Sequence, residues 1–220
     1  MMDSQIFSIW KEVGMTSYDV VNIIKKKSKD SKVGHCGTLD PFADGVILIC
    51  TGNETKNINN LMDLKKEYIA DIILGCETDT LDNTGSIIKK KEYSLFNQEK
   101  ITGILNQFIG NTEQIPPYFS ALKFKGKPLY KYARKDIFIR KKPRMISIYD
   151  IKLLKIKKKM VQIYVKCGKG TYIRSLARDI AYKLNTYAYV NKLTRTKVGT
   201  YNKDNAINFK NIKECFQSIN

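Results

Sequence analysis

The chain has 220 residues, 43% of them hydrophobic, a length that suits one globular body and falls short of two domains of typical size. Thirty-nine Lys and Arg against 21 Asp and Glu give a net charge of +18, which favours a polyanionic partner, although an AT-rich genome would also enrich lysine. The five cysteines are odd in number, which argues against a disulfide framework. The single histidine argues against a zinc site. No apolar run is long enough for a membrane span.

The N-terminal half predicts a strand, a helix and a rigid loop. Residues 6–10 form a short strand pattern, and Thr16 with Ser17 offers an N-cap for a helix whose apolar side chains share one face. The segment 34–41 holds two glycines and a proline, so it cannot be regular structure, and it leads into the apolar run 46–50, typical of a buried strand. Another strand is predicted over residues 66–74.

The C-terminal half mixes helices and strands in an irregular order. Apolar residues from Ile101 to Phe108 recur at i, i+3, i+4 and i+7, which predicts a helix that Gly110 can terminate. Strand patterns follow at 145–156 and 160–167, and a second amphipathic helix starts near Thr171. This order predicts an α+β fold with a mixed, mostly antiparallel sheet flanked by helices.

The residues between these elements are basic. The stretch 114–144 combines prolines with many Lys, Arg and Tyr, which predicts an extended surface element. Six arginines lie in or beside segments that carry other distinctive sequence features. Codon bias explains their placement poorly. Their placement therefore favours nucleic acid; they are Arg134, Arg140, Arg144, Arg174, Arg178 and Arg195.

The most informative segment is GHCGTLDPFADGVILICTGNETK, residues 34–56. Its glycines allow close backbone approach, and Asp40 before Pro41 fixes a carboxylate at a turn in front of a buried strand, as preorganised catalysis requires. An Asp-Pro pair alone more often only caps a turn. The segment is similar to the catalytic block of the TruB family of pseudouridine synthases, G-H-x-G-T-L-D-P-x-A-x-G-V-L followed by G-x-A-T-K, with Glu54 in place of Ala.

Other blocks of the family follow in the expected order over roughly residues 11–201. This sequence departs from the family pattern at Glu12, where proline is usual, and at Phe119, where tyrosine is usual. Members often continue into an RNA-binding domain of PUA type, whereas about twenty residues follow Tyr201 here. We therefore expect a single catalytic domain over residues 1–220, with an insertion at about 114–144 and no such C-terminal domain. The matching blocks are residues 14–17, 66–68, 74–75 with 78–80, 116–123 and 167–176.

The resemblance implies a pseudouridine synthase fold and an enzyme that isomerises uridine 55 in the T-loop of tRNA by flipping the base. Asp40 would attack the ribose anomeric carbon or the uracil ring, or promote elimination to a glycal, and these routes stay open. Arg174 matches the active-site arginine that would keep Asp40 ionised. Tyr68 matches the tyrosine that stacks on the target base, and Leu193 matches the apolar residue opposite that ring.

His35 matches the histidine that enters the space left by the flipped base. Further residues of the matching blocks are expected to contact the RNA: Gly34, Thr38, Lys123, Lys169 and Tyr172. The basic insertion resembles a segment of the family that closes over the RNA, where its charges would meet phosphates.

Two other functions stay open: a noncatalytic tRNA-binding or tRNA-folding protein on the same scaffold, and a guide-RNA-dependent rRNA pseudouridine synthase. Retention of Asp40, Tyr68 and Arg174 together argues against the first. The second class needs a C-terminal domain to dock its guide particle. We expect no cofactor, no metal and no membrane, the T-arm of tRNA as partner, a monomer, and a cytoplasmic location with an organelle matrix as the alternative.

Overall fold

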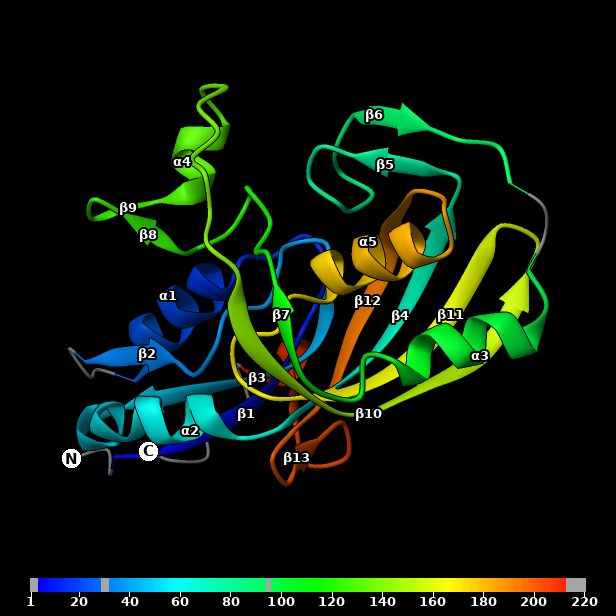
Figure 1. Cartoon of the computed structure of the whole chain (residues 1–220). Helices are drawn as coiled ribbons and strands as arrows, with labels where there is room; N and C mark the ends of the chain where they lie inside the picture. Colours follow the sequence, from blue (N-terminus) through cyan, green and yellow to red (C-terminus); the bar gives the residue numbers. More distant parts are fainter. Residues whose placement is uncertain (1–3, 29–31, 94–95, 213–220) are drawn as a thin grey trace. The chain divides into compact units, whose positions relative to one another are not determined.

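The computed structural model describes residues 4–28, 32–93 and 96–212. Figure 1 shows its helices and strands in sequence colours. The chain divides into two compact units, and the second is one continuous segment between the two segments of the first. The first unit comprises Met1–Tyr68 with Leu193–Asn220, and the second comprises Ile69–Lys192. Strands β4 (Lys66–Leu74) and β12 (Ala188–Val198) each contribute residues to both units.

In the first unit the strands run in the order β14-β1-β3-β12, with β2 also paired to β3 and β13 to β12. The pairs β1–β3 and β2–β3 are antiparallel, whereas β1–β14 and β12–β3 are parallel. The elements added here are β1 (Ile6–Lys11), α1 (Ser17–Lys27), β2 (Val33–His35), β3 (Asp44–Thr51), η1 (Gly52–Asn57), α2 (Ile58–Asp63), β13 (Tyr201–Asn202), β14 (Ile207–Asn208) and η2 (Phe209–Asn211).

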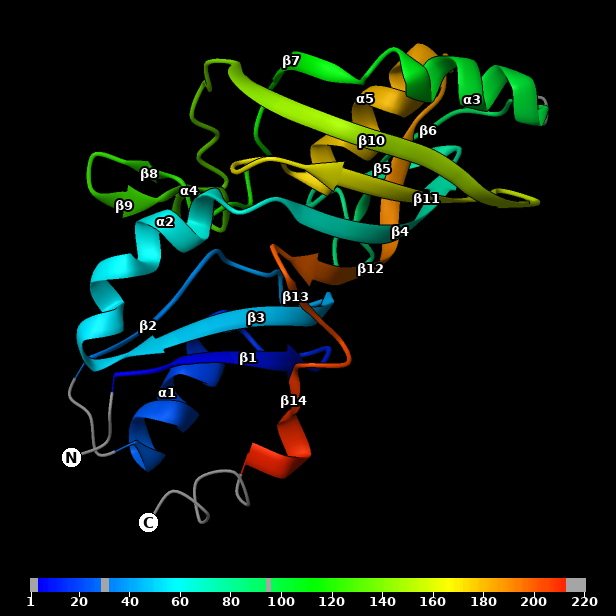
Figure 2. The same cartoon turned by 90° about the horizontal axis from the view of Figure 1, so that it is seen from below.

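Strand β3 is buried along almost its whole length because both faces of this sheet are covered. Ile47 and Ile49 point to one face and pack with Val20 and Ile24 of α1. The alternate residues of β3 point to the other face, where partly buried side chains of α2 pack against them. Helices α1 and α2 accordingly lie on opposite sides of β1 and β3 (Figure 2). This two-sided burial explains why the run 46–50 has no polar alternation.

Helix α1 begins where the sequence predicts. Thr16 is the N-cap: its hydroxyl accepts from the Asp19 N–H, and the Asp19 carboxylate accepts from the Thr16 N–H. Three lysines occupy the last turn, where they complement the helix dipole. The helix therefore has a defined start, which positions Ser17 directly after the cap.

In the second unit the strands run β4-β11-β10-β7, and β10 pairs antiparallel with both β11 and β7. Helix α3 packs on β10 and also touches α5. Two short hairpins, β5–β6 and β8–β9, stand outside this sheet. The elements are β5 (Cys76–Thr78), β6 (Ile87–Lys90), α3 (Gln98–Asn106), β7 (Gly110–Gln114), β8 (Lys123–Phe124), β9 (Lys127–Pro128), α4 (Leu129–Ala133), β10 (Arg144–Lys157), β11 (Met160–Cys167) and α5 (Ile173–Lys183).

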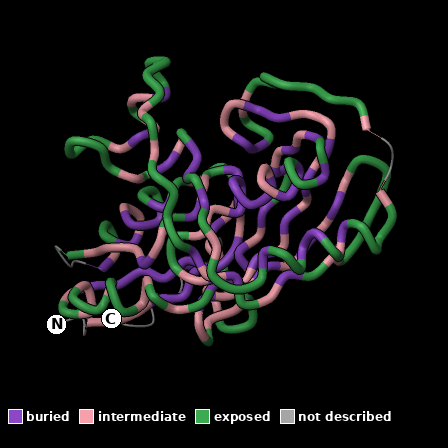
Figure 3. Tube along the Cα trace, viewed as in Figure 1, coloured by how far each residue is buried: buried purple, intermediate pink, exposed green. Residues whose placement is uncertain are grey.

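These elements confirm the predicted α+β class with its mostly antiparallel sheet. The predicted strand at 66–74 is found at those residues, and every residue of the apolar stripe predicted for α5 is buried. The insertion is more regular than an extended segment, because it contains the β8–β9 hairpin and α4, and much of it is exposed (Figure 3).

The four described cysteines are free thiols, and Cys215 lies outside the described residues. No described helix combines the length and the apolar character that crossing a bilayer requires.

Candidate active site

The loop that carries Asp40 connects β2 to β3, and we refer to residues 36–43 as the Asp40 loop. Leu39 is buried, whereas Asp40 is half-buried and Thr38 is exposed. The Ala43 N–H donates to the Asp40 carbonyl at 3.1 Å, which closes a turn at the Asp-Pro pair. The loop thus has one apolar anchor and leaves the Asp40 side chain at the surface of the first unit.

Two buried side chains at the start of the chain hold this loop. The Ser17 hydroxyl accepts from the Leu39 N–H at 2.9 Å and is within 3.0 Å of the Leu39 carbonyl. Lys11 is completely buried, and its ammonium donates to the carbonyls of Glu12, Met15 and Ala43. The residues on both sides of Asp40 are therefore fixed by side-chain hydrogen bonds to the backbone.

Arg195 holds the same loop from β12. Its guanidinium donates to the carbonyl of Val46 at 2.6 Å, of Thr38 at 3.2 Å and of Gly37 at 3.3 Å, and the residue is 1% exposed. The sequence analysis counted Arg195 among the arginines that favour nucleic acid, and for this residue the interpretation is wrong, because its whole guanidinium is used inside the protein.

Gly45 allows strand β12 to approach β3 closely. Arg195 pairs with Gly45 in the parallel β12–β3 ladder, and a Cβ at Gly45 would lie 2.2 Å from the Arg195 carbonyl oxygen. The Gly45 φ of +118° is also one that side chains rarely adopt. The glycine of the D-G-V motif is thus required by the contact that places Arg195 under the loop.

The charges around the loop affect its titratable groups. Burial, followed by the Arg195 guanidinium, lowers the pKa of His35 below its ordinary value of 6.5, so the imidazole is neutral at pH 7. Burial and Arg195 also lower the pKa of Lys11 to about 8, although the Asp40 and Asp44 carboxylates oppose this shift. The Asp40 carboxylate is therefore close enough to the buried Lys11 ammonium to interact with it.

The other predicted residues of the first unit lie on neighbouring elements. Gly34 and His35 belong to β2, and a Cβ at Gly34 would clash with the Ile58 side chain. Tyr68 on β4 and Leu193 on β12 are both buried. Whether Tyr68 and Leu193 enclose a uracil stays a prediction.

In the second unit, Arg174 is buried near the start of α5. Its guanidinium donates to the carbonyls of Thr80 and Phe119, each at 2.8 Å, and lies 3.3 Å from the Asp82 carboxylate. The Asp82 carboxylate in turn accepts from the hydroxyls of Thr80 and Thr84. We call this set the Arg174 clamp. It fixes the arginine far more tightly than a phosphate contact on a helix flank would require.

The start of α5 is held by the strand before the insertion. The Tyr172 N–H donates to the Gln114 side chain at 2.8 Å, and the Gln114 amide returns a bond to the Tyr172 carbonyl. Tyr172 is half-buried, and Lys169 is exposed in the turn before it. Asp40 and Arg174 belong to different units, and their pairing stays a prediction.

The insertion pairs its aromatic rings with its own cations. Lys141 Nζ lies 3.0 Å from the centroid of the Tyr118 ring, and Arg134 lies over Tyr130. Burial and Arg178 lower the pKa of Lys141 to about 8. Lys123, in the β8–β9 hairpin, is exposed. The segment thus presents charge outward while its rings pack locally.

Sequence reasoning missed three residues that build the site, Lys11, Ser17 and Asp82, and it gave Arg195 a different role. A signal existed for Ser17 and Asp82, because both stand in or beside matched blocks. None existed for Lys11 or for the internal role of Arg195, because a lysine or arginine on a strand is ordinarily solvated.

The chain is similar in sequence to known proteins of one family. Residues 25–173 match the model of the TruB family pseudouridylate synthase, N-terminal domain. The chain is 45% identical over 209 residues to tRNA pseudouridine synthase B of Clostridium tetani, covering 95% of this chain and 72% of the relative. It is 42% identical over 210 residues to the protein of that name from Caldanaerobacter subterraneus, covering 95% and 74%.

A solved structure supports the fold. A chain in the crystal structure of a Cbf5-Nop10-Gar1 complex matches with a TM-score of 0.74 and 28% identity, covering 95% of this chain and 53% of that chain. This chain therefore spans about half the length of that relative, and the predicted pseudouridine synthase fold is confirmed. From the matched family model and the two bacterial relatives it follows that the chain belongs to the TruB family of pseudouridylate synthases.

Proposed function

We propose that this chain converts uridine 55 in the T-arm of tRNA to pseudouridine, with Asp40 as the catalytic carboxylate. In this reaction the bond between uracil N1 and ribose C1′ breaks and a bond between C5 and C1′ forms. The C5 proton is lost and N1 gains one, so the nucleoside keeps its composition and no redox partner is needed. The observation that carries the proposal is the Asp40 loop, whose neighbours Thr38, Leu39 and Ala43 are each held by a buried side chain.

A fixed carboxylate suits this chemistry because the reacting atoms must meet in one geometry while the base turns. Preorganised groups lose little entropy at the moment of reaction. The buried Lys11 ammonium interacts with the Asp40 carboxylate and donates to the Ala43 carbonyl of the same loop, so it supports the position of the group that would react. The route through C1′, the ring or a glycal stays open.

Roles for the other residues follow from the resemblance and are supported by their settings. Arg174 would act on the carboxylate or substrate from its clamp, with Asp82 as a positioning residue. Tyr68 and Leu193 are buried on strands, as a base-stacking pair would be. The His35 imidazole is neutral at pH 7. Moving it from water into the gap in an RNA loop therefore costs less desolvation free energy than moving an imidazolium would.

RNA recognition would come from charge and shape. The exposed Lys123 and Lys169 can meet phosphates, and the half-buried Tyr172 belongs to the same matching block as Lys169. Thr38, on the Asp40 loop, is also exposed. The bacterial relatives carry tRNA in their names, which supports tRNA as the substrate. The similarity of 28% to a chain from the Cbf5-Nop10-Gar1 complex is weaker support for an enzyme that works in a complex with other proteins.

The test is to incubate the purified chain alone with an unmodified tRNA transcript and to map pseudouridine by carbodiimide adducts and primer extension. We expect a stop at position 55 without any guide RNA, partner protein or added cofactor. RNA binding without any product would favour the noncatalytic scaffold. A product that forms only when a guide RNA is supplied would favour the guide-dependent class.

A further inference from the structure

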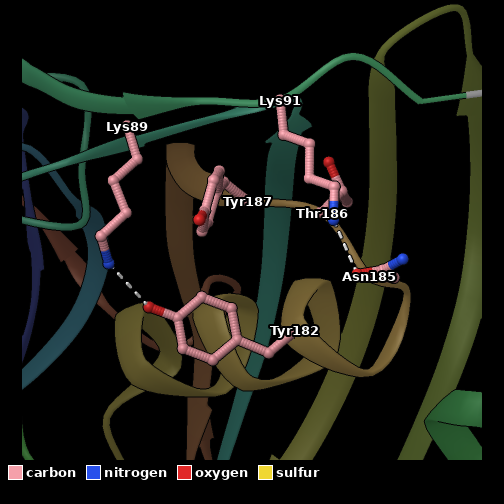
Figure 4. A pocket seen from close by; sticks show the side chains of 6 residues that line it. All are labelled: Lys89, Lys91, Tyr182, Asn185, Thr186 and Tyr187. Carbon is pink, nitrogen blue, oxygen red and sulfur yellow. Dashed lines mark hydrogen bonds between the residues drawn. The ribbon is translucent and has the colours of Figure 1, made fainter.

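A pocket of about 330 Å³ lies in the second unit between β6, the end of α5 and the start of β12. We call it the α5–β6 pocket, and Figure 4 shows the side chains that line it. Neither the active-site residues nor the insertion contribute to it. Its lining residues are Lys89, Lys91, Tyr182, Asn185, Thr186 and Tyr187.

A buried carboxylate fixes one ring and one cation of the pocket, and the second ring packs against the first. Glu77 is 4% exposed and accepts from the Tyr182 hydroxyl at 2.7 Å and from Lys89 at 2.8 Å. The Tyr182 and Tyr187 rings lie edge to face, with centroids 6.0 Å apart, and Lys89 Nζ is 5.3 Å from the Tyr187 centroid. Burial and the Glu77 bond raise the pKa of Tyr182, so it stays a neutral phenol. The rings are therefore preorganised.

The pocket also carries positive charge beyond what its carboxylate neutralises. Lys89 balances Glu77, whereas Lys91 donates to the neutral amide oxygen of Asn185 at 2.7 Å. Lys90 and Lys159 are close enough to lower the pKa of the Cys76 thiol against the effect of its burial. Lys91 is thus the lining ammonium group that is available to an anion in this pocket.

Backbone hydrogen bonds hold together the chain segments around the pocket. The Gly75 N–H donates to the Tyr187 carbonyl at 2.8 Å, and the Lys91 N–H donates to the Gly75 carbonyl at 2.8 Å. The Leu74 N–H donates to the Lys159 carbonyl at 2.8 Å. The pocket also leaves one polar group unused, since the buried Thr186 hydroxyl makes no hydrogen bond with any residue that the structure describes.

Aromatic faces beside ammonium groups and an amide are what an unpaired nucleotide needs: a surface for its base and cations for its phosphate. We propose that the α5–β6 pocket is a second RNA contact, which binds one unpaired nucleotide of the substrate outside the active site. The proposal rests on the proposed function. Tyr182 follows Arg174 by eight residues on α5, about 12 Å at 1.5 Å per residue, so one RNA loop can reach both.

The experiment measures binding of the full chain to an unmodified tRNA transcript and to a T-arm stem-loop, over a series of salt concentrations. Lys91→Gln should weaken binding about three- to tenfold and reduce the slope of log Kd against log salt by about one. Tyr187→Leu should weaken binding about tenfold with the slope unchanged, because stacking releases no counterions. Tyr187→Phe keeps the ring and should restore the affinity.

Lys100→Gln, an exposed lysine on α3, is the matched control and should bind as the wild type does. Thermal unfolding of each variant separates a folding defect from a lost contact. The proposal is overturned if Lys91→Gln and Tyr187→Leu bind both RNAs with wild-type affinity and slope while the wild type makes pseudouridine. A wild type that binds RNA but makes no pseudouridine defeats the proposed function instead, and the binding comparison still decides the pocket.

Discussion

The Asp40 loop and the insertion at 114–144 are both loop-rich segments that the sequence analysis marked for function, and they differ in what fixes their side chains. Ser17, Lys11 and Arg195 reach the Asp40 loop from other elements and bind its backbone from inside the protein. In the insertion, Arg134 lies over the Tyr130 ring and the Tyr132 hydroxyl donates to the Phe124 carbonyl, so both rings contact the insertion's own residues, and its lysines are mostly exposed.

This difference matches the two tasks. A reacting carboxylate benefits from a geometry that is set before the substrate arrives, since each ångström of misplacement costs rate. A surface that follows an RNA backbone benefits from long, solvated cations that adapt to phosphates. Changes in the first region should therefore affect the rate and the folding free energy, and changes in the second should affect affinity.

The largest effect is expected at the Arg174 clamp. Arg174→Lys should lower the single-turnover rate about a hundredfold or more, because the compact ammonium of lysine lacks the planar fork with which the guanidinium binds Thr80, Phe119 and Asp82. Asp82→Asn should lower it about tenfold, since the guanidinium loses its carboxylate. RNA affinity should stay within about threefold of wild type in both. Rates within twofold of wild type would show that the clamp is structural only.

Next comes the support of the Asp40 loop. Arg195→Met leaves the carbonyls of Gly37, Thr38 and Val46 without their donor, so the free energy of unfolding should fall by about 2 to 4 kcal/mol. Arg134→Met, at an exposed site in the insertion, should change it by no more than about 0.5 kcal/mol. Urea unfolding measures both. Equal losses in the two variants would remove the contrast between the regions.

A smaller effect is expected in the insertion. Lys123→Gln should weaken tRNA binding about three- to tenfold and reduce the salt slope by about one, because one phosphate contact is lost. The rate at saturating tRNA should be unchanged. A fall in that rate with unchanged affinity would assign Lys123 to the reaction and not to recognition.

The smallest effect concerns His35, the single histidine, whose ring protons give one NMR titration. Its midpoint should lie below 6.5, because burial and Arg195 disfavour the charged ring. The unfolded chain then takes the proton first, so stability should fall as pH drops below about 6.5. His35→Asn should lack this part of the pH dependence. A midpoint at or above 6.5 would contradict the described setting of His35.

Local patterns predicted much of the fold. The strand pattern of 66–74 and the Thr16 cap predict β4 and α1 because both signals lie within a few residues. Helix α2 was missed because its apolar residues span little more than one turn, and the pairing of β1 with β14 joins residues about two hundred positions apart. Such partners leave no periodic signal.

The site shows the same limit. Asp40 and His35 could be identified because they stand in one contiguous block. The contact of Arg174 with Asp82 joins residues 92 positions apart, and that of Arg195 with Thr38 joins residues 157 apart. The side chains that hold a reactive residue come from wherever the fold brings a donor, so their types alone do not reveal them.

The most direct test of the account is Asp40→Asn, assayed with an unmodified tRNA transcript for both tRNA binding and single-turnover product formation. The amide is isosteric with the carboxylate but cannot act as nucleophile or base, so we expect no detectable pseudouridine at position 55, with a Kd for tRNA within about threefold of the wild type. Product formation above about one hundredth of the wild-type rate would show that a different group performs the reaction.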